Sequence, residues 1–234
     1  MAAQGWATDS RIGIELGGLP QSEATTIAAA AGRHGTTVGD CTQAMRLLRM
    51  RKTPQEVELM RRAAVIGEQT AAAALPEVTA GTRIVDVRQR FAVEVAGRGV
   101  QLEHFAFAPQ GMILTEVGDY VAATGDTTFV DYGCIYQGYY SDSGVTLTVG
   151  ALAASCRRDY DLLGESMAAG LSALRPGTPA SQVQAIMAAV TRRAGFDSFP
   201  HGHGLGLEMR DYPILVPDTG LRIRDDFVDE PADL

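Results

Sequence analysis

The chain has 234 residues, of which 46% are hydrophobic and 21% charged, and this composition is typical of a folded globular protein. Its 28 acidic and 20 basic residues give a net charge of -8, which argues against a nucleic-acid-binding surface. No apolar run approaches the roughly 20 residues that span a bilayer, and the first residues lack the pattern of a secretion signal. We therefore expect a cytoplasmic protein without nucleic-acid or membrane partners.

The first 50 residues contain too little apolar sequence for a core of their own. Residues 10–16 are predicted to form a short strand, and an alanine-rich helix is predicted from Ser22, a candidate N-cap, to Gly32. A stronger helix signal follows at Thr53, where a hydroxyl, a proline and Glu56 form a capping-box pattern. This pattern predicts a helix from Thr53 to about Leu75.

A weak internal repeat indicates that two parts of the chain share one structure. The repeated unit is a helix, a Gly-Thr turn and a second helix that closes on a glycine, at Gly97 or Gly99 in the first copy. Chance matching of alanine-rich helices is the alternative explanation. The residues Leu75, Gly81, Thr82, Val87 and Gly99 recur at one constant offset as Leu171, Gly177, Thr178, Val183 and Gly195.

The segment from Thr127 to Val149 is predicted to form antiparallel strands, because it is rich in Val, Tyr, Phe and Thr with glycines at turn positions. If residues 135–138 form the loop of a hairpin, Asp131 faces Asp142 directly, with Cβ atoms about 4.5–5.5 Å apart. Two carboxylates at that distance repel each other unless they share a proton or a cation. A divalent metal ion would explain the pair; the alternative is two solvated residues at strand ends.

His203 is a second candidate ligand, because it lies in a segment where Gly202, Gly204 and Gly206 allow close approach of the backbone. A satisfied structural histidine is the alternative. An oxygen-rich donor set with one imidazole suits Mn, Co, Fe or Zn and differs from a thiolate zinc site.

These motifs resemble the creatinase/aminopeptidase P/methionine aminopeptidase family, whose pita-bread fold is a duplicated α+β domain. The motifs Asp131-Tyr-Gly133, Gly138-Tyr-Tyr-Ser-Asp142 and Gly202-His-Gly-Leu-Gly-Leu207 are similar to the family's in order and spacing. The resemblance covers residues 53–234 and is greatest to Xaa-Pro dipeptidase (prolidase) and aminopeptidase P. It implies residues 1–50 as a remnant of a creatinase-type N-terminal domain and residues 51–234 as a catalytic domain.

The resemblance implies a hydrolase that acts on a small peptide or amide substrate through a metal-bridging water. Asp131, Asp142 and His203 are then ligands of divalent metal ions, ideally two. A homodimer is compatible with it, since many relatives are dimers. Two other functions remain open: a creatinase-like C-N hydrolase or C-S lyase on the same scaffold, and a binding module without catalysis.

Several positions depart from the family pattern. Two Glu ligands are expected after His203. Residues 220–226 superficially resemble the segment of the last one, with Arg224 in its place, but we prefer another account, in which residues 227–234 resemble the stretch that precedes the first. We therefore expect a fold incomplete at its C-terminus, fewer than two metal ions, and a weak or inactive chain. The window from Gly111 to Asp126 lacks the family's substrate-side histidine, and His104 precedes that window.

Arg210 occupies the place of a second substrate-side histidine. A guanidinium binds a carboxylate through two hydrogen bonds, which an imidazole cannot do, so Arg210 is a candidate substrate-binding residue. The alternative is a solvated arginine paired with Asp211.

Overall fold

The computed structural model describes residues 10–108, 120–197, 200–217 and 231–232. The chain divides into two compact units, Met1–Arg51 and Lys52–Leu234. None of the helices in the described ranges is long and apolar enough to cross a membrane.

The first unit is a small α/β arrangement in which two short parallel strands pair with each other and are connected by a helix. Strand β1 pairs with β2 in register, from Arg11 opposite Thr37 to Ile14 opposite Asp40. The predicted cap at Ser22 is wrong: the first helix begins at Gln21 with Pro20 as its N-cap, and Ser22 lies inside the helix. The elements are β1 (Arg11–Ile14), η1 (Leu16–Gly18), α1 (Gln21–Gly32), β2 (Thr37–Asp40) and α2 (Thr42–Met50).

The second unit begins with the helix that the capping box predicts. The Thr53 hydroxyl accepts a hydrogen bond from the Glu56 amide, and the Glu56 carboxylate accepts one from the Thr53 amide, at 3.3 and 2.7 Å. The predicted helix start is therefore confirmed. The first part of this unit contains α3 (Pro54–Ala74), η2 (Leu75–Glu77), α4 (Ile84–Gly97), β3 (Gln101–Ala108), β4 (Thr127–Tyr136), β5 (Tyr139–Tyr140) and β6 (Ser143–Thr148).

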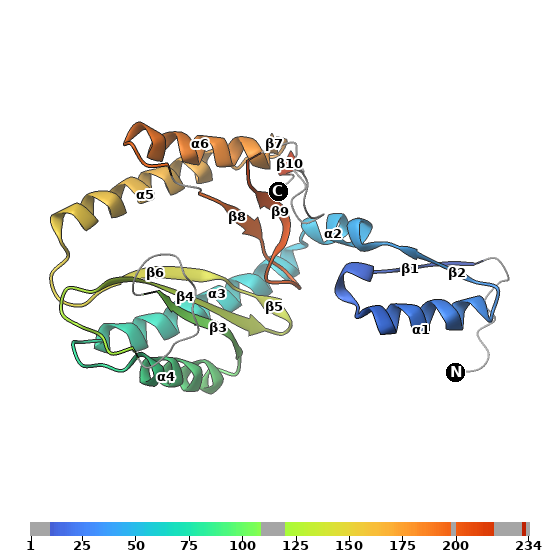
Figure 1. Cartoon of the computed structure of the whole chain (residues 1–234), viewed down its shortest axis with the longest axis horizontal. Coiled ribbons are helices and arrows are strands. Elements are labelled where there is room, and N and C mark those ends of the chain that lie inside the picture. Colours follow the sequence, from blue (N-terminus) through green and yellow to red (C-terminus); the bar gives the residue numbers. More distant parts are fainter. Residues whose placement is uncertain (1–9, 109–119, 198–199, 218–230, 233–234) are drawn as a thin grey trace. The chain divides into compact units, whose positions relative to one another are not determined.

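An antiparallel sheet forms the centre of this part, with β4 between β3 on one edge and β5 and β6 on the other. Figure 1 shows helices α3 and α4 on one side of this sheet. One face of α4, with Ile84, Val87, Phe91 and Val95, is fully buried against the sheet. The sheet contributes large side chains at alternate positions: Phe105, Phe107, Val130, Tyr132 and Cys134.

The alternation of side chains in the sheet decides where chemistry can occur. Val130, Tyr132 and Cys134 on β4 point into the core, so Asp131 and Gly133 between them lie on the opposite face. That opposite face is covered by neither α3 nor α4 and carries the candidate ligands.

The second part of the unit repeats the helical pattern of the first. Gly81 and Gly177 both have positive φ, at 92° and 83°, and each precedes a helix of 14 residues. Val87 and Val183 occupy equivalent buried positions in the two helices. The elements are α5 (Ala154–Ala173), β7 (Thr178–Pro179), α6 (Ala180–Arg193), β8 (Gly202–Gly204), β9 (Asp211–Leu215) and β10 (Pro231–Ala232).

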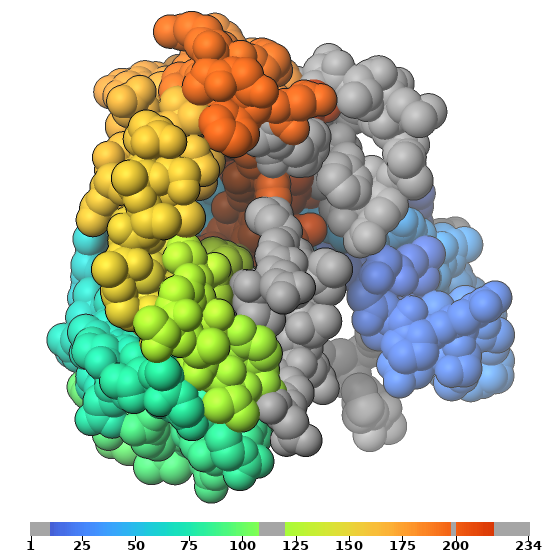
Figure 2. All heavy atoms as spheres, turned by 60° about the vertical axis from the view of Figure 1, so that its left-hand side comes forward, coloured from blue at the N-terminus to red at the C-terminus, as the bar shows by residue number. Residues whose placement is uncertain are grey.

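Helix α5 packs on α6 through small residues. Ser166 donates a hydrogen bond to the Met187 carbonyl at 2.9 Å, and a Cβ on Gly170 would lie 2.6 Å from Met187 Cγ. Figure 2 shows α5, in yellow, at the surface of this unit. The small residues therefore allow the two helices to approach closely.

Candidate metal centre

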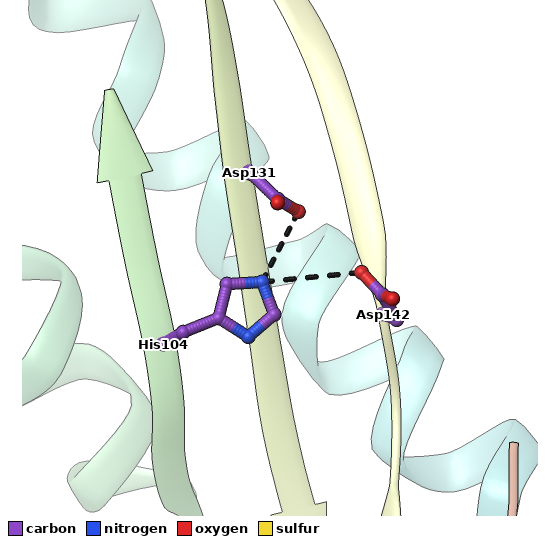
Figure 3. Close-up of side chains that lie close together, drawn as sticks. All are labelled: His104, Asp131 and Asp142. Carbon is purple, nitrogen blue, oxygen red and sulfur yellow. Dashed lines mark hydrogen bonds and ion pairs between the residues drawn. The ribbon is translucent and has the colours of Figure 1, made fainter. Parts of the chain in front are cut away.

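Three side chains converge on the face of the sheet opposite α3 and α4 (Figure 3). His104 Nε2 lies 3.1 Å from Asp131 Oδ1 and 3.9 Å from Asp142 Oδ1. The three residues come from β3, from β4 and from the link between β5 and β6. One possible ligand atom from each lies within 4.8 Å of the others, so together they could hold a metal ion.

The two aspartates share a face, but they are not directly opposed as the sequence predicted. Asp131 lies opposite Gly144, because the hairpin turns through Gln137 and Gly138 alone, with φ of 50° and 86°. The predicted loop of residues 135–138 is two residues too long. Since side chains alternate with a period of two, this error leaves Asp142 on the face of Asp131 as a diagonal neighbour.

His203 approaches Asp142 from β8, on the other side of the carboxylate. Its Nε2 lies 3.2 Å from Asp142 Oδ2, while its Nδ1 donates to the Gly204 carbonyl at 2.9 Å. The hydrogen bond from His203 lowers the pKa of Asp142 although burial opposes this. The same bond raises the pKa of His203. Asp142 therefore uses one oxygen towards each imidazole.

His104 was not among the residues that the sequence placed at the site. Its Nδ1 donates to the carboxylate of Glu103, and its Nε2 faces the aspartates. Burial disfavours its charged form, but hydrogen bonds to Asp131 and Glu103 outweigh burial and raise the pKa of His104 to about 9. The carboxylates thus favour a positive charge at this point. The alternation of the buried Phe105 and Phe107 could have placed His104 on the face opposite the core, but it could not have placed it beside Asp131.

Arg210 is exposed and lies just before β9. Its charge opposes the rise in the pKa of His203 but does not outweigh it, which places the guanidinium within electrostatic range of the centre. Asp211, the suggested partner of Arg210, is instead buried and pairs with Lys52, whose Nζ lies 3.0 Å from Asp211 Oδ2. A Cβ on Gly206 would lie 2.7 Å from that oxygen, so this glycine leaves room for the ion pair.

Other predicted features lie outside the described residues. Most of the window from Gly111 to Asp126 is among them, and so are Arg224 and residues 227–230.

Comparison with known proteins gives matches that cover most of the chain. The model of metallopeptidase family M24 matches residues 58–228. The Xaa-Pro dipeptidase of Pyrococcus furiosus is 28% identical over 71% of this chain and 50% of its own length. The probable dipeptidase PepE of Mycobacterium tuberculosis is 29% identical over 88% of this chain and 59% of its own. The chain thus spans about half the length of these curated relatives.

Solved structures show the same fold. The X-Pro aminopeptidase of Thermotoga maritima matches with a TM-score of 0.81 at 18% identity, over 96% of this chain and 62% of that one. Prolidase from Pyrococcus furiosus matches with a TM-score of 0.79 at 23% identity, over 95% and 64%. Dipeptidase PepE of Mycobacterium ulcerans matches with a TM-score of 0.78 at 26% identity, over 89% and 57%. The α+β pita-bread fold expected from the sequence is confirmed.

Proposed function

The chain belongs to metallopeptidase family M24, and on that premise we propose that it contributes to the metal-dependent hydrolysis of a peptide or amide bond, with Xaa-Pro dipeptides as substrates. The observation that carries the proposal is the arrangement of Asp131 and Asp142 on one face of the sheet with imidazoles beside them. The names of two relatives, an Xaa-Pro dipeptidase and a probable dipeptidase, support the substrate class.

The donor set fits a divalent transition metal. Asp131, Asp142 and His203 would contribute ligands to such ions, since carboxylate oxygens and imidazole nitrogens together suit Mn, Co, Fe or Zn. Such an ion, when bound, lowers the pKa of its water and stabilises negative charge that develops on a carbonyl oxygen. The hydrogen bond from His203 Nδ1 to the Gly204 carbonyl keeps Nε2 directed towards Asp142.

Metal-dependent stabilisation and cleavage test this proposal together. Mn or Co is expected to raise the melting temperature of the chain, and Asp142→Asn is expected to abolish the increase because it removes the carboxylate between the imidazoles. Asp86→Asn, on the exposed surface of α4, is the matched control and is expected to respond like the wild type. Equal stabilisation of the Asp142→Asn variant would contradict the metal centre.

The assay for cleavage uses an Xaa-Pro dipeptide with each metal, beside creatine-like and C-S lyase substrates. Cleavage of the dipeptide above the Asp142→Asn background would support the proposal. Turnover of another substrate alone would favour the alternative enzymes on this scaffold. Absence of any bound metal, measured as metal content per chain, would favour a binding module.

We propose that Arg210 binds a carboxylate of the substrate. The support is its exposed position within electrostatic range of His203, with Asp211 already paired to Lys52. Arg210→Ala is expected to raise KM for a dipeptide with a free carboxylate far more than for the corresponding amide. Arg158→Ala, exposed on α5, is the control. An unchanged ratio of the two KM values would show that Arg210 is a surface charge.

We also propose that residues 1–234 by themselves have low activity and bind fewer than two metal ions. The resemblance implies five protein ligands, of which three are assigned here, and loss of ligands weakens a two-metal site. A longer polypeptide with a Gly-Met-Val segment and two further Glu ligands is expected to bind close to two ions. Robust metal-dependent Xaa-Pro cleavage by residues 1–234 alone would contradict this proposal.

We also propose a cytoplasmic location and a homodimer. Light scattering tests the homodimer.

A further inference from the structure

The imidazole of His104 is oriented in the way that metal-binding histidines usually are. Its Nδ1 donates to the Glu103 carboxylate, which fixes the proton on that nitrogen in the neutral ring. Its Nε2 then offers a lone pair towards Asp131 Oδ1 and Asp142 Oδ1, at 3.1 and 3.9 Å. The ring thus has the Glu103 carboxylate on its Nδ1 side and the two aspartates on its Nε2 side. A cation is the natural occupant of the space between Nε2 and the two aspartates.

The backbone around His104 is shaped to hold this ring. His104 lies opposite Gly133, and a Cβ on Gly133 would lie 2.6 Å from His104 Cε1 and 2.7 Å from Nδ1. The register of β3 against β4 also shifts between Leu102 and His104. Irregularities of this kind redirect side chains next to active sites. The imidazole of His104 therefore fills the space that a side chain at position 133 would occupy.

We propose that His104 is a metal ligand and that, with Asp131 and Asp142, it forms a three-donor site for one divalent transition-metal ion. This inference rests on the proposed metal-dependent function and adds a ligand that the resemblance does not supply. Three protein donors leave at least one position open to water or substrate, as in catalytic zinc sites. One imidazole with two carboxylates favours Co, Zn or Fe over Mg or Ca.

His203 lies outside this three-donor group. It contacts Asp142 through Oδ2, whereas His104 faces Oδ1 of the same carboxylate. An ion next to Oδ1 therefore has His104 as its imidazole ligand. Removal of His104 is therefore expected to weaken binding of this ion more than removal of His203 does.

Co(II) binding to the chain of residues 1–234 tests the assignment without any activity assay. Calorimetry gives Kd, and Co(II) absorption and the paramagnetically shifted imidazole N–H resonances report the ligands. His104→Ala is expected to raise Kd by at least about 10- to 100-fold, the range that loss of a supporting residue alone produces, and to remove one shifted N–H resonance. His34→Ala, an exposed histidine of the first unit, is the matched control and is expected to change neither.

Glu103→Gln keeps the imidazole and removes only the charge behind it, so it tests the same site if His104→Ala fails to fold. It is expected to raise Kd by about 10-fold. The inference is overturned if Asp142→Asn abolishes Co(II) binding while His104→Ala and Glu103→Gln keep the wild-type Kd and spectrum. In that case the metal centre stands and the ligand assignment falls. Absence of Co(II) binding by the wild type would overturn both, whereas bound Co(II) without cleavage counts against the proposed function alone.

Discussion

Asp142 is the residue on which the geometry of the centre depends, because it contacts both imidazoles. Its Oδ2 is 3.2 Å from His203 Nε2, and its Oδ1 is 3.9 Å from His104 Nε2. An ionised carboxylate has two negatively charged oxygens, so it can contact both imidazoles at once. A hydroxyl or an amide has only one acceptor oxygen, and that oxygen carries no full charge. The position between β5 and β6 thus connects the first sheet to the β8–β9 hairpin.

The carboxylate of Glu56 makes the free energy of unfolding depend on pH, and a substitution at this one residue can measure its contribution. Hydrogen bonds from the Thr53 amide, and further from the Tyr139 hydroxyl, lower the pKa of Glu56. A lowered pKa in the folded state stabilises the fold above the unfolded value of 4.5, and this contribution is lost as pH falls through the folded value. Glu56→Ala is therefore expected to lower the free energy of unfolding more at pH 7 than at pH 3.

Urea unfolding at the two pH values measures this difference. Glu58→Ala is the matched control on the same helix, since its carboxylate faces the exposed Arg61. A Glu56→Ala effect that stays the same at pH 3 would show that the capping carboxylate contributes through packing alone.

The sequence could identify Asp131 and Asp142 but could not fix how they face each other. Period-two alternation keeps both on one face whichever turn joins the strands, so the shared face was predictable. The direct opposition depended on a loop of four residues, and a turn of two residues replaced it. His104 was missed because its place depends on pairing with Gly133 and on a register shift, which are non-local.

At the scale of elements, an ion pair ties the start of α3 to the strand that follows the His203 segment. Lys52 Nζ lies 3.0 Å from Asp211 Oδ2, and the Asp211 side chain is fully buried. The other Asp211 oxygen accepts a hydrogen bond from the Tyr212 amide at 3.0 Å. The pair therefore anchors the segment between β8 and β9, which carries Arg210.

Lys52→Met is expected to destabilise the protein by about 3–5 kcal/mol, because it leaves the Asp211 carboxylate buried without its cation. Urea unfolding measures the loss. Arg90→Met is the control: it removes a cation from an exposed pair with Glu77 and is expected to cost no more than about 1 kcal/mol. The double variant Lys52→Met/Asp211→Asn is expected to be more stable than Lys52→Met. A Lys52→Met cost as small as that of Arg90→Met would contradict the anchoring role.

Elements with local signals were predictable, and those that depend on partners were not. The capping box predicts the start of α3 from the four residues Thr53 to Glu56 alone. Strand β2 forms by parallel pairing with β1, from which it is separated in the sequence by the whole of α1. No pattern within Thr37–Asp40 itself indicates a strand. The start of α1 at Gln21 follows from Pro20, whose φ of -55° already suits a residue at a helix entrance.

At the scale of the molecule, the internal repeat appears as two equivalent pairs of helices. Helices α3 and α4 form the first pair and α5 and α6 the second, with Gly99 and Gly195 in the left-handed region after α4 and α6. The sequence could predict this duplication because glycines with positive φ are not freely replaced, so they keep the register of the two copies. Of the ligand residues, Asp131 and Asp142 lie between the two copies, and His203 follows the second.

The equivalent turns of the two repeats both contain a glycine with positive φ. Gly81 and Gly177 have φ of 92° and 83°, and no atom lies within 4 Å of a Cβ added at either position. Alanine is therefore expected to cost only the strain of the left-handed backbone, about 1–2 kcal/mol at each position. Gly164→Ala, in open space on the exposed side of α5, is expected to stabilise the protein by about 0.5–1 kcal/mol instead. Thermal and urea unfolding of the three variants measure these changes, and a cost at Gly81 without one at Gly177 would show that the two turns are not equivalent.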